Sequence, residues 1–191
     1  MTGSLFLNGA PGKYSLADIS GTFVICADGA YNYIKDRIKP DLLIGDFDSI
    51  DLTNLPLDVE TLKFSSKKDY TDGQLAVQEA AKRGIKQLTI YGAFGGRIDQ
   101  VFVNYSLLKL ASSLGMEAHL VSDEFWVYGI RDKFEGAASV GKIISLAPYG
   151  DSIHIISTEG LAYPAHGLLV GNDLITSISN QALGGRFFVQ V

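Results

Sequence analysis

The chain has 191 residues, of which 47% are hydrophobic and 19% are charged, enough apolar material for a substantial core. Its formal net charge of −5 argues against a nucleic-acid-binding protein, which would carry a basic face. The single Cys26 excludes an intramolecular disulfide, and no stretch approaches the roughly 20 apolar residues of a membrane span. The N-terminal residues lack the pattern of a signal peptide. We therefore expect a cytoplasmic protein with no nucleic-acid or membrane partner.

A glycine-lysine pair near the N-terminus invites comparison with a phosphate-binding P-loop. It follows a predicted strand over residues 4–7. A P-loop opens with glycine and ends in Ser or Thr, whereas Leu7 and Tyr14 occupy those positions here. We therefore interpret residues 8–13 as a turn, and a phosphate-handling protein with this sequence needs another apparatus.

Carboxylates follow two predicted buried strands. Residues 23–27 run into Asp28, and residues 42–44 run through Gly45 into Asp46 and Asp48. If the extended conformation persists, Asp46 and Asp48 point to the same side. Open α/β sheets bind ligands beyond the carboxyl ends of their strands, and paired carboxylates suit Mg²⁺. The alternative is a polar turn whose aspartates are merely solvated.

The next segment carries the signals of a helix start. Thr71 and Gln74 have the spacing of a capping box, and Gly84 marks the end of the helix. Asp72, in the first turn, either complements the helix dipole or belongs to a phosphate site, since phosphates bind at helix N-termini. Lys68, just upstream, fits the second interpretation.

A glycine-rich turn follows the predicted strand over residues 87–91. Glycines let backbone amides approach a ligand closely, and Arg97 can bind phosphate oxygens in bidentate fashion. Asp99 follows, and a helix with one broad apolar face is expected to run on to Gly115. Arg97, Gln100 and Asn104 would border that face together if Arg97 is already helical.

The pattern changes after about residue 123. Before it, strands and helices alternate, which predicts an α/β domain with a mainly parallel sheet over residues 1–123. After it, glycines recur among short β-type runs, which predicts a smaller all-β sandwich domain over residues 124–191. Trp126, near this boundary, is expected to be buried in the core, with stacking on a flat ligand as the alternative. Expected strands lie at residues 142–147, 152–157, 167–170, 175–178 and 187–191.

These features occur in the order seen in thiamin pyrophosphokinases, which the chain resembles over nearly its whole length. The resemblance implies a catalytic α/β domain, a β-sandwich domain, and a homodimer with active sites between subunits. It implies transfer of the diphosphate of ATP to the hydroxyl of thiamin, giving thiamin diphosphate and AMP, with Mg²⁺. The seven blocks that carry it are residues 28–30, 39–49, 68–72, 95–99 with Asn104, 145–148, 160–164 and 177–180.

The resemblance also implies residue roles. Asp46, Asp48 and Asp72 would hold magnesium and the triphosphate. Arg97 would contact phosphate, and Asp99, our candidate general base, would lie beside the thiamin hydroxyl. The nucleotide would be bound by Asp28, Lys68, Asp69, Thr71, Gly95, Gly96 and Asn104. Thiamin would be bound by Ser177, Ser179 and Asn180, with the two serines on one strand face and serving the partner subunit's site.

Two positions depart from the family pattern. Phe94 stands where the family usually has Thr, and Gln100 stands where His is common. Loss of that hydroxyl and that imidazole would affect the contacts to the nucleotide and the reaction rate. Two other functions stay open: a pyrophosphokinase for another hydroxymethyl heterocycle such as a pterin, and a non-catalytic module that binds nucleotide or thiamin. A metal-dependent phosphohydrolase is a weaker third.

Overall fold

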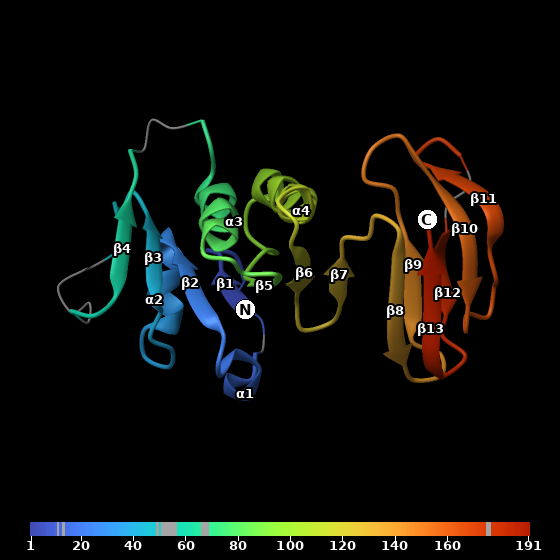
Figure 1. The fold of residues 1–191 in the computed structure, drawn as a ribbon, viewed down its shortest axis with the longest axis horizontal. Coiled ribbons are helices and arrows are strands. Elements are labelled where there is room, and N and C mark those ends of the chain that lie inside the picture. The colour runs from blue at the N-terminus through green and yellow to red at the C-terminus, as the bar shows by residue number, and fades with distance from the viewer. Residues whose placement is uncertain (11, 13, 49, 51–56, 66–68, 175–176) are drawn as a thin grey trace. The chain divides into compact units, whose positions relative to one another are not determined.

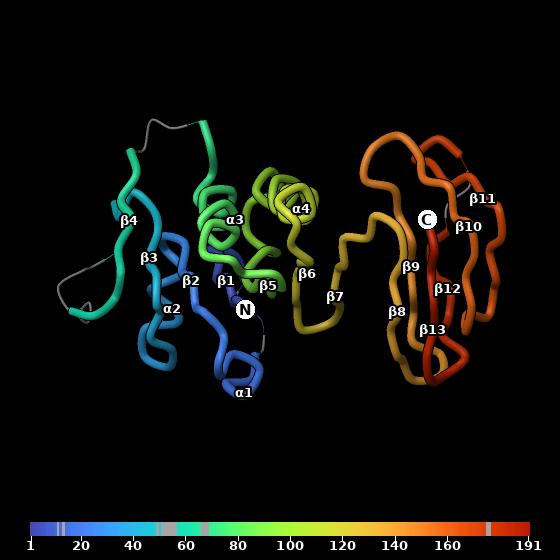
Figure 2. Tube along the Cα trace, in the orientation of Figure 1, coloured from blue at the N-terminus to red at the C-terminus, as the bar shows by residue number. Residues whose placement is uncertain are grey.

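The computed structural model describes residues 1–10, 12, 14–48, 50, 57–65, 69–174 and 177–191. The chain divides into two compact units, Met1–Gly129 and Ile130–Val191 (Figures 1 and 2). The first unit holds a mostly parallel sheet with helices, and the second holds antiparallel strands. The predicted fold class, an α/β domain followed by a smaller all-β domain, is confirmed.

The sheet of the first unit has the strand order β4-β3-β2-β1-β5-β6-β7. Neighbours from β4 through β6 are parallel, and only β7 joins antiparallel. The chain leaves β1 toward β2 on one side and later returns to β5 on the other. The crevice at such a reversal of strand order is where open α/β sheets bind ligands. The strands are β1 Thr2–Phe6, β2 Phe23–Ala27, β3 Leu42–Gly45, β4 Glu60–Lys63, β5 Gln87–Tyr91, β6 Glu117–Val121 and β7 Trp126–Tyr128.

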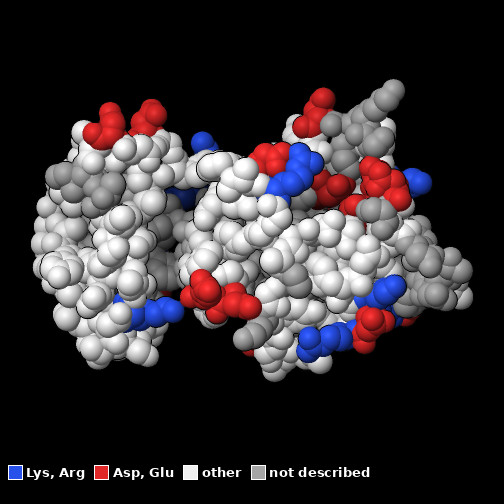
Figure 3. Space-filling model, turned by 180° about the vertical axis from the view of Figure 1, so that it is seen from behind, with Lys and Arg blue, Asp and Glu red and all other residues white. Residues whose placement is uncertain are grey.

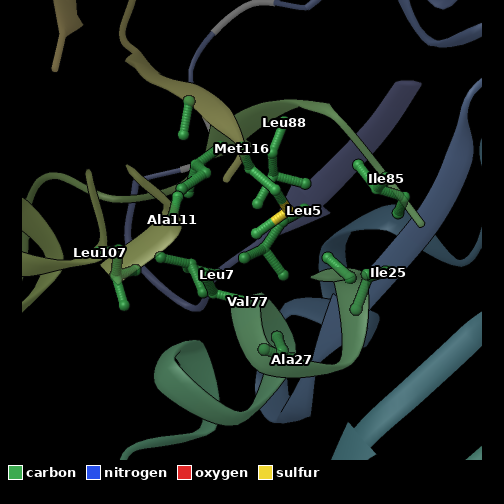
Figure 4. Packing of buried hydrophobic residues seen from close by; sticks show 14 of the residues in the cluster. Leu5, Leu7, Ile25, Ala27, Val77, Ile85, Leu88, Leu107, Ala111 and Met116 are labelled. Carbon is green, nitrogen blue, oxygen red and sulfur yellow. The ribbon is translucent and has the colours of Figure 1, made fainter. Parts of the chain in front are cut away.

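The central strands of this sheet are buried on both faces, and β2 and β3 are accordingly continuous apolar runs. On one face Leu5 and Ile25 pack against α3 and α4, and Figure 4 shows them in one buried cluster with Val77 of α3 and Leu107 of α4. On the other face Phe6 and Leu43 pack against α1 and α2. The helical elements are α1 Leu16–Ile19, η1 Asp28–Ala30, α2 Tyr31–Ile34, α3 Asp72–Lys82 and α4 Ile98–Ser113.

The predicted capping box at the start of α3 is confirmed. Gln74 N donates to Thr71 Oγ1 over 3.2 Å, and Thr71 N donates to Gln74 Oε1 over 2.9 Å. These reciprocal bonds satisfy two backbone donors that a helix start otherwise leaves without partners. At the other end, Gly84 has the left-handed φ of +76° expected of a residue that ends a helix.

The second unit contains a four-stranded antiparallel sheet in the order β11-β10-β13-β8 and a two-stranded sheet, β12-β9. Leu146 of the small sheet and Ile155, Val170 and Val189 of the large one belong to one buried cluster. The unit therefore has its own core between its two sheets. Its strands are β8 Lys133–Ala138, β9 Ile143–Leu146, β10 Ser152–Glu159, β11 His166–Gly171, β12 Ser177–Gln181 and β13 Gly185–Gln190.

The structure differs from expectation around the boundary between the units. Strand β7 pairs with β6, so the division lies after Gly129 and not after residue 123. Trp126, on β7, is 62% exposed, so the expectation that it is buried is wrong. Strand β8 was not predicted, and its central Gly136 has a packing reason: a Cβ there would lie 2.6 Å from Cζ of Phe187.

None of the described helices has both the length and the apolar character that crossing a membrane requires. On the face in Figure 3, basic and acidic side chains are interspersed and do not form a continuous block of one sign. This is the pattern expected from the composition, with no basic patch among the described residues of that face.

His119 on β6 predicts how stability depends on pH. Its ring stacks on Tyr128 with centroids 5.1 Å apart, Nε2 lies 3.3 Å from Thr89 Oγ1, and burial lowers the pKa of the imidazole. Below the unfolded pKa of about 6.5 the unfolded chain binds more protons than the folded chain. The free energy of unfolding should therefore fall as pH drops from 6.5 toward the lower folded pKa. Denaturant unfolding at pH 7.5 and 5.5 measures this.

The matched variant is His119→Gln, which does not titrate and keeps a polar group near Thr89. We expect it to lose less stability than the wild-type chain over the same pH interval. An equal loss in both proteins would show that His119 stays equally protonated in the folded and unfolded states.

Candidate functional site

The carboxyl ends of the central strands meet at one edge of the sheet. Asp28 directly follows β2, Asp46 directly follows β3, and the glycine-rich turn that leads to Arg97 follows β5. Because Ala27 pairs with Ile44 in the parallel register, the ends of β2 and β3 lie at the same level. Because of this topology, these polar segments share one edge of the sheet.

Three aspartates converge there. Asp28, Asp46 and Asp48 each offer a carboxylate oxygen, and these oxygens all lie within 4.8 Å of one another. Asp28 and Asp46 are half-buried and Asp48 is exposed. Like charges this close repel one another unless a cation offsets them, and oxygen-only ligands of this kind match the preference of Mg²⁺. The residues present therefore fit a divalent cation.

The convergence of Asp46 and Asp48 has a different cause from the one expected. Strand β3 ends at Gly45, and Phe47 adopts a left-handed φ of 65°, so the chain turns and does not stay extended. Asp48 N donates to Asp46 Oδ1 over 3.2 Å across this turn. The left-handed conformation costs a non-glycine residue about 1–2 kcal/mol. The Phe47 ring packs against the core on the α2 face, and this burial helps to offset the strain.

Glycine at position 45 is a requirement of this arrangement. A Cβ built on Gly45 would lie 2.9 Å from Cβ of Asp28 and 3.1 Å from its Oδ1. Any side chain here would push β3 away from β2 and separate the carboxylates. The Gly-Asp-Phe-Asp motif thus combines a close approach with a tight turn.

Several predicted site residues lie at or just before the start of α3. None of those that the structure describes belongs to the three-carboxylate group. Thr71 caps the helix, and Asp72 occupies its first position. Among the described residues the group contains Asp28 where the sequence prediction had Asp72. Asp69 is exposed ahead of the helix, and Lys68 lies outside the described residues.

Arg97 and Asp99 form an exposed ion pair at the end of the glycine-rich turn. Arg97 Nε donates to Asp99 Oδ1 over 3.1 Å, and a second bond joins the guanidinium to Oδ2. This hydrogen bonding holds the pKa of the Asp99 carboxyl below its usual range and raises that of Arg97. Gly95 and Gly96 both have left-handed φ angles, of 81° and 66°.

Arg97 is the N-cap of α4 and has extended dihedral angles, so it is not helical. The condition under which Arg97, Gln100 and Asn104 would border one helix face therefore fails. Asn104 instead donates from Nδ2 to the carbonyl of Ala93 over 2.8 Å, which fastens α4 to the turn. Gln100 is exposed, and its backbone N–H donates to Asp99 Oδ1 over 3.0 Å.

Phe94, one of the two departures from the family pattern, is part of an aromatic cluster. Its ring lies edge-on to Phe125 at 4.9 Å and to Tyr105 at 5.9 Å between centroids. The position is half-buried and packs against the core beneath α3 and α4. The aromatic side chain therefore anchors the turn where a threonine would offer a hydroxyl.

The predicted thiamin-binding residues lie on β12 in the second unit. Ser177 pairs with Leu146 but Asn180 pairs with Ile144, so β12 has one extra residue at this point, and Ser179 has a φ of 60°. This bulge interrupts the alternation that would place Ser177 and Ser179 on one face. Ser179 N donates to Ser145 Oγ over 3.1 Å.

Asn180 is buried and holds a neighbouring loop. Its Oδ1 accepts from Tyr163 N over 3.0 Å, and its Nδ2 donates to Tyr163 O over 2.6 Å. Oδ1 also accepts from Gln181 N over 2.8 Å. The carboxamide is thus engaged within the unit, a role that only the folded chain reveals.

Comparison with known proteins gives consistent results. The family model for the catalytic domain of thiamin pyrophosphokinase matches residues 19–119, more than half of the chain. The thiamine pyrophosphokinase of Bacillus subtilis is 25% identical over 169 residues, covering 83% of this chain and 77% of the relative.

Solved structures share the fold. The crystal structure of the Bacillus subtilis enzyme superimposes with a TM-score of 0.87 at 22% identity, covering 100% of this chain and 94% of that one. Thiamin pyrophosphokinase from Candida albicans gives a TM-score of 0.79 at 17% identity, covering 99% and 85%. Together with the match of the family model, these results show that the chain belongs to the thiamin pyrophosphokinase family of transferases.

Proposed function

We propose that the chain transfers the diphosphate group of ATP to the hydroxyl of thiamin, forming thiamin diphosphate and AMP. The observation that carries the proposal is the group formed by Asp28, Asp46 and Asp48 at the strand ends, in a chain of this family. A carboxylate group of this kind suits a phosphate chain held through a divalent cation. The Arg97–Asp99 pair, beyond the end of β5 at the same edge of the sheet, would supply a phosphate-binding group and a proton acceptor.

Asp28, Asp46 and Asp48 would hold Mg²⁺, which when bound would offset the negative charge of the phosphates. The resemblance also named Asp72 as a ligand, and Asp72 and Lys68 stay predictions from the sequence alone. Asp69, Thr71, Gly95 and Gly96 likewise stay proposed nucleotide contacts.

The protein's part in the transfer is to position groups and offset charge. The thiamin hydroxyl oxygen would attack the β-phosphorus, and the bond from that phosphorus to the oxygen bridging the α-phosphate would break, so that AMP leaves. Arg97 would donate to phosphate oxygens. Asp99 would accept the hydroxyl proton, and it becomes a better base when Arg97 turns from it to phosphate, because the bond that lowers its pKa is then lost.

We also propose that the second unit contributes to thiamin binding through Ser177 and Ser179, and that the protein is a homodimer, as the resemblance implies. For Asn180 we propose a positioning role, since its carboxamide is engaged with Tyr163.

The reaction is tested by incubating the purified protein with ATP, Mg²⁺ and thiamin and separating the products. Equal amounts of AMP and thiamin diphosphate are expected. ADP with thiamin monophosphate would indicate a simple kinase and overturn the proposal. If thiamin gives no product, a hydroxymethyl pterin is the next acceptor to try, and binding of ATP or thiamin without AMP release would indicate a binding module.

Asp48→Asn tests the carboxylate group. We expect turnover to fall by at least about a hundredfold, because the amide removes one of three charges that would hold the cation. The fold should survive, since Asp48 is exposed. Initial rates over a range of Mg²⁺ concentrations and a melting curve measure both effects.

The matched control is Asp173→Asn, an exposed aspartate in the second unit, which should leave rate and melting unchanged. Near-normal activity of Asp48→Asn with the same Mg²⁺ dependence would remove Asp48 from the site.

Asn180→Ala tests the positioning role. Truncation leaves the backbone N–H and C=O of Tyr163 without their side-chain partners, so the free energy of unfolding should fall by about 1–3 kcal/mol. Denaturant unfolding measures this. Unchanged stability together with a large rise in the KM for thiamin would instead make Asn180 a direct substrate contact.

A further inference from the structure

The turn that follows β1 lies between the two halves of the candidate site. On one side, Gly9 N donates to Gly92 O over 2.9 Å, which joins this turn to the glycine-rich turn after β5. On the other side, the Asn8 carboxamide lies against Gly29, one residue beyond Asp28. A Cβ built on Gly29 would be 2.4 Å from Asn8 Nδ2 and 2.8 Å from its Cγ. Residues 8 and 9 thus connect the segment that carries Asp28 to the segment that leads to Arg97.

The register of the sheet places Asn8 at the level of the carboxylates. Phe6 pairs with Cys26 on β2, and continuing this parallel register by two residues sets Asn8 opposite Asp28. Phe6 also pairs with Tyr91 on β5, so Asn8 lies beyond β1 where the strand order reverses. This is the place in an open α/β sheet where a ligand binds.

The carboxamide of Asn8 lies against Gly29 and is available for binding. The residue is exposed, and its side chain forms no hydrogen bond with any other residue that the structure describes. The absence of a side chain at Gly29 leaves room for the group, because a larger residue at 29 would collide with it. Asn104 and Asn180 differ from it, since each uses its amide within the fold.

We propose that Asn8 is a further substrate-contacting residue, whose Nδ2 donates to a phosphate oxygen of the polyphosphate bound at the carboxylates. This inference rests on the proposed function. Three aspartates near a phosphate chain make anionic groups costly there, and a neutral amide donates hydrogen bonds without adding charge. The Gly12-Lys13 pair is not needed for this contact, so the turn can serve phosphate binding without being a P-loop.

Asn8→Asp and Asn8→Ala test the proposal. Asn8→Asp keeps the shape but removes the donor and adds a charge that repels phosphate, so the KM for ATP should rise by more than about tenfold. Asn8→Ala should raise it by about tenfold. The KM for thiamin should not change in either variant, and the melting temperature should not change in Asn8→Ala, which adds no charge beside the aspartates. Asn172→Asp, the same exchange at an exposed turn of the second unit, should leave the KM for ATP as in the wild type. It is a control for KM and not for melting, because Asn172 Nδ2 donates to Gly150 O over 2.9 Å.

An unchanged KM for ATP in both variants would overturn the proposal, and so would a fall in melting temperature without a change in KM, which would show that Asn8 only packs against Gly29. Failure of the proposed reaction is distinguishable, since it would appear in the wild-type protein. In that case the affinity for ATP with Mg²⁺ is measured by calorimetry. An affinity about tenfold weaker in Asn8→Asp than in the wild type supports the contact between Asn8 and phosphate, and an equal affinity overturns it.

Discussion

The close approach of β2 and β3 at their carboxyl ends is the constraint on which the candidate site depends. Gly45 lies so near Asp28 that a single added carbon would come within 2.9 Å of its Cβ. With this contact in place, the Phe47 turn brings Asp46 and Asp48 to within 4.8 Å of Asp28. The acidic group is therefore built by backbone packing in the sheet, and its charge repulsion is opposed by the buried strands beneath it.

Features with a local or periodic cause could be predicted from the sequence. The capping box of Thr71 and Gln74 needs only two residues at fixed spacing, and it formed as expected. Strands β2 and β3 were located because burial on both faces makes them continuous apolar runs. The shared edge for Asp28 and Asp46 followed from one rule of parallel sheets, without knowledge of any side-chain contact.

Features caused by contacts between distant residues could not be predicted. Gly136 weakens the strand pattern of β8, and its reason is the ring of Phe187, which is remote in sequence. The bulge at Ser179 depends on the register between β12 and β9, and the role of Asn180 depends on Tyr163. The sequence indicated that Asp28 follows a strand. It could not indicate that Asp28 lies beside Asp46 and Asp48, because this depends on the turn at Phe47.

The second charged feature of the candidate site is the ion pair of Arg97 and Asp99. Arg97 is engaged with Asp99, so part of its charge is already offset before any ligand arrives. In the reaction that we propose, a phosphate that drew Arg97 away would exchange one anionic partner for another and would leave Asp99 a stronger base at the same moment. The arrival of the phosphate donor would then itself prepare the proposed proton acceptor. The exposed position of the pair allows the exchange, because neither side chain must leave a buried site.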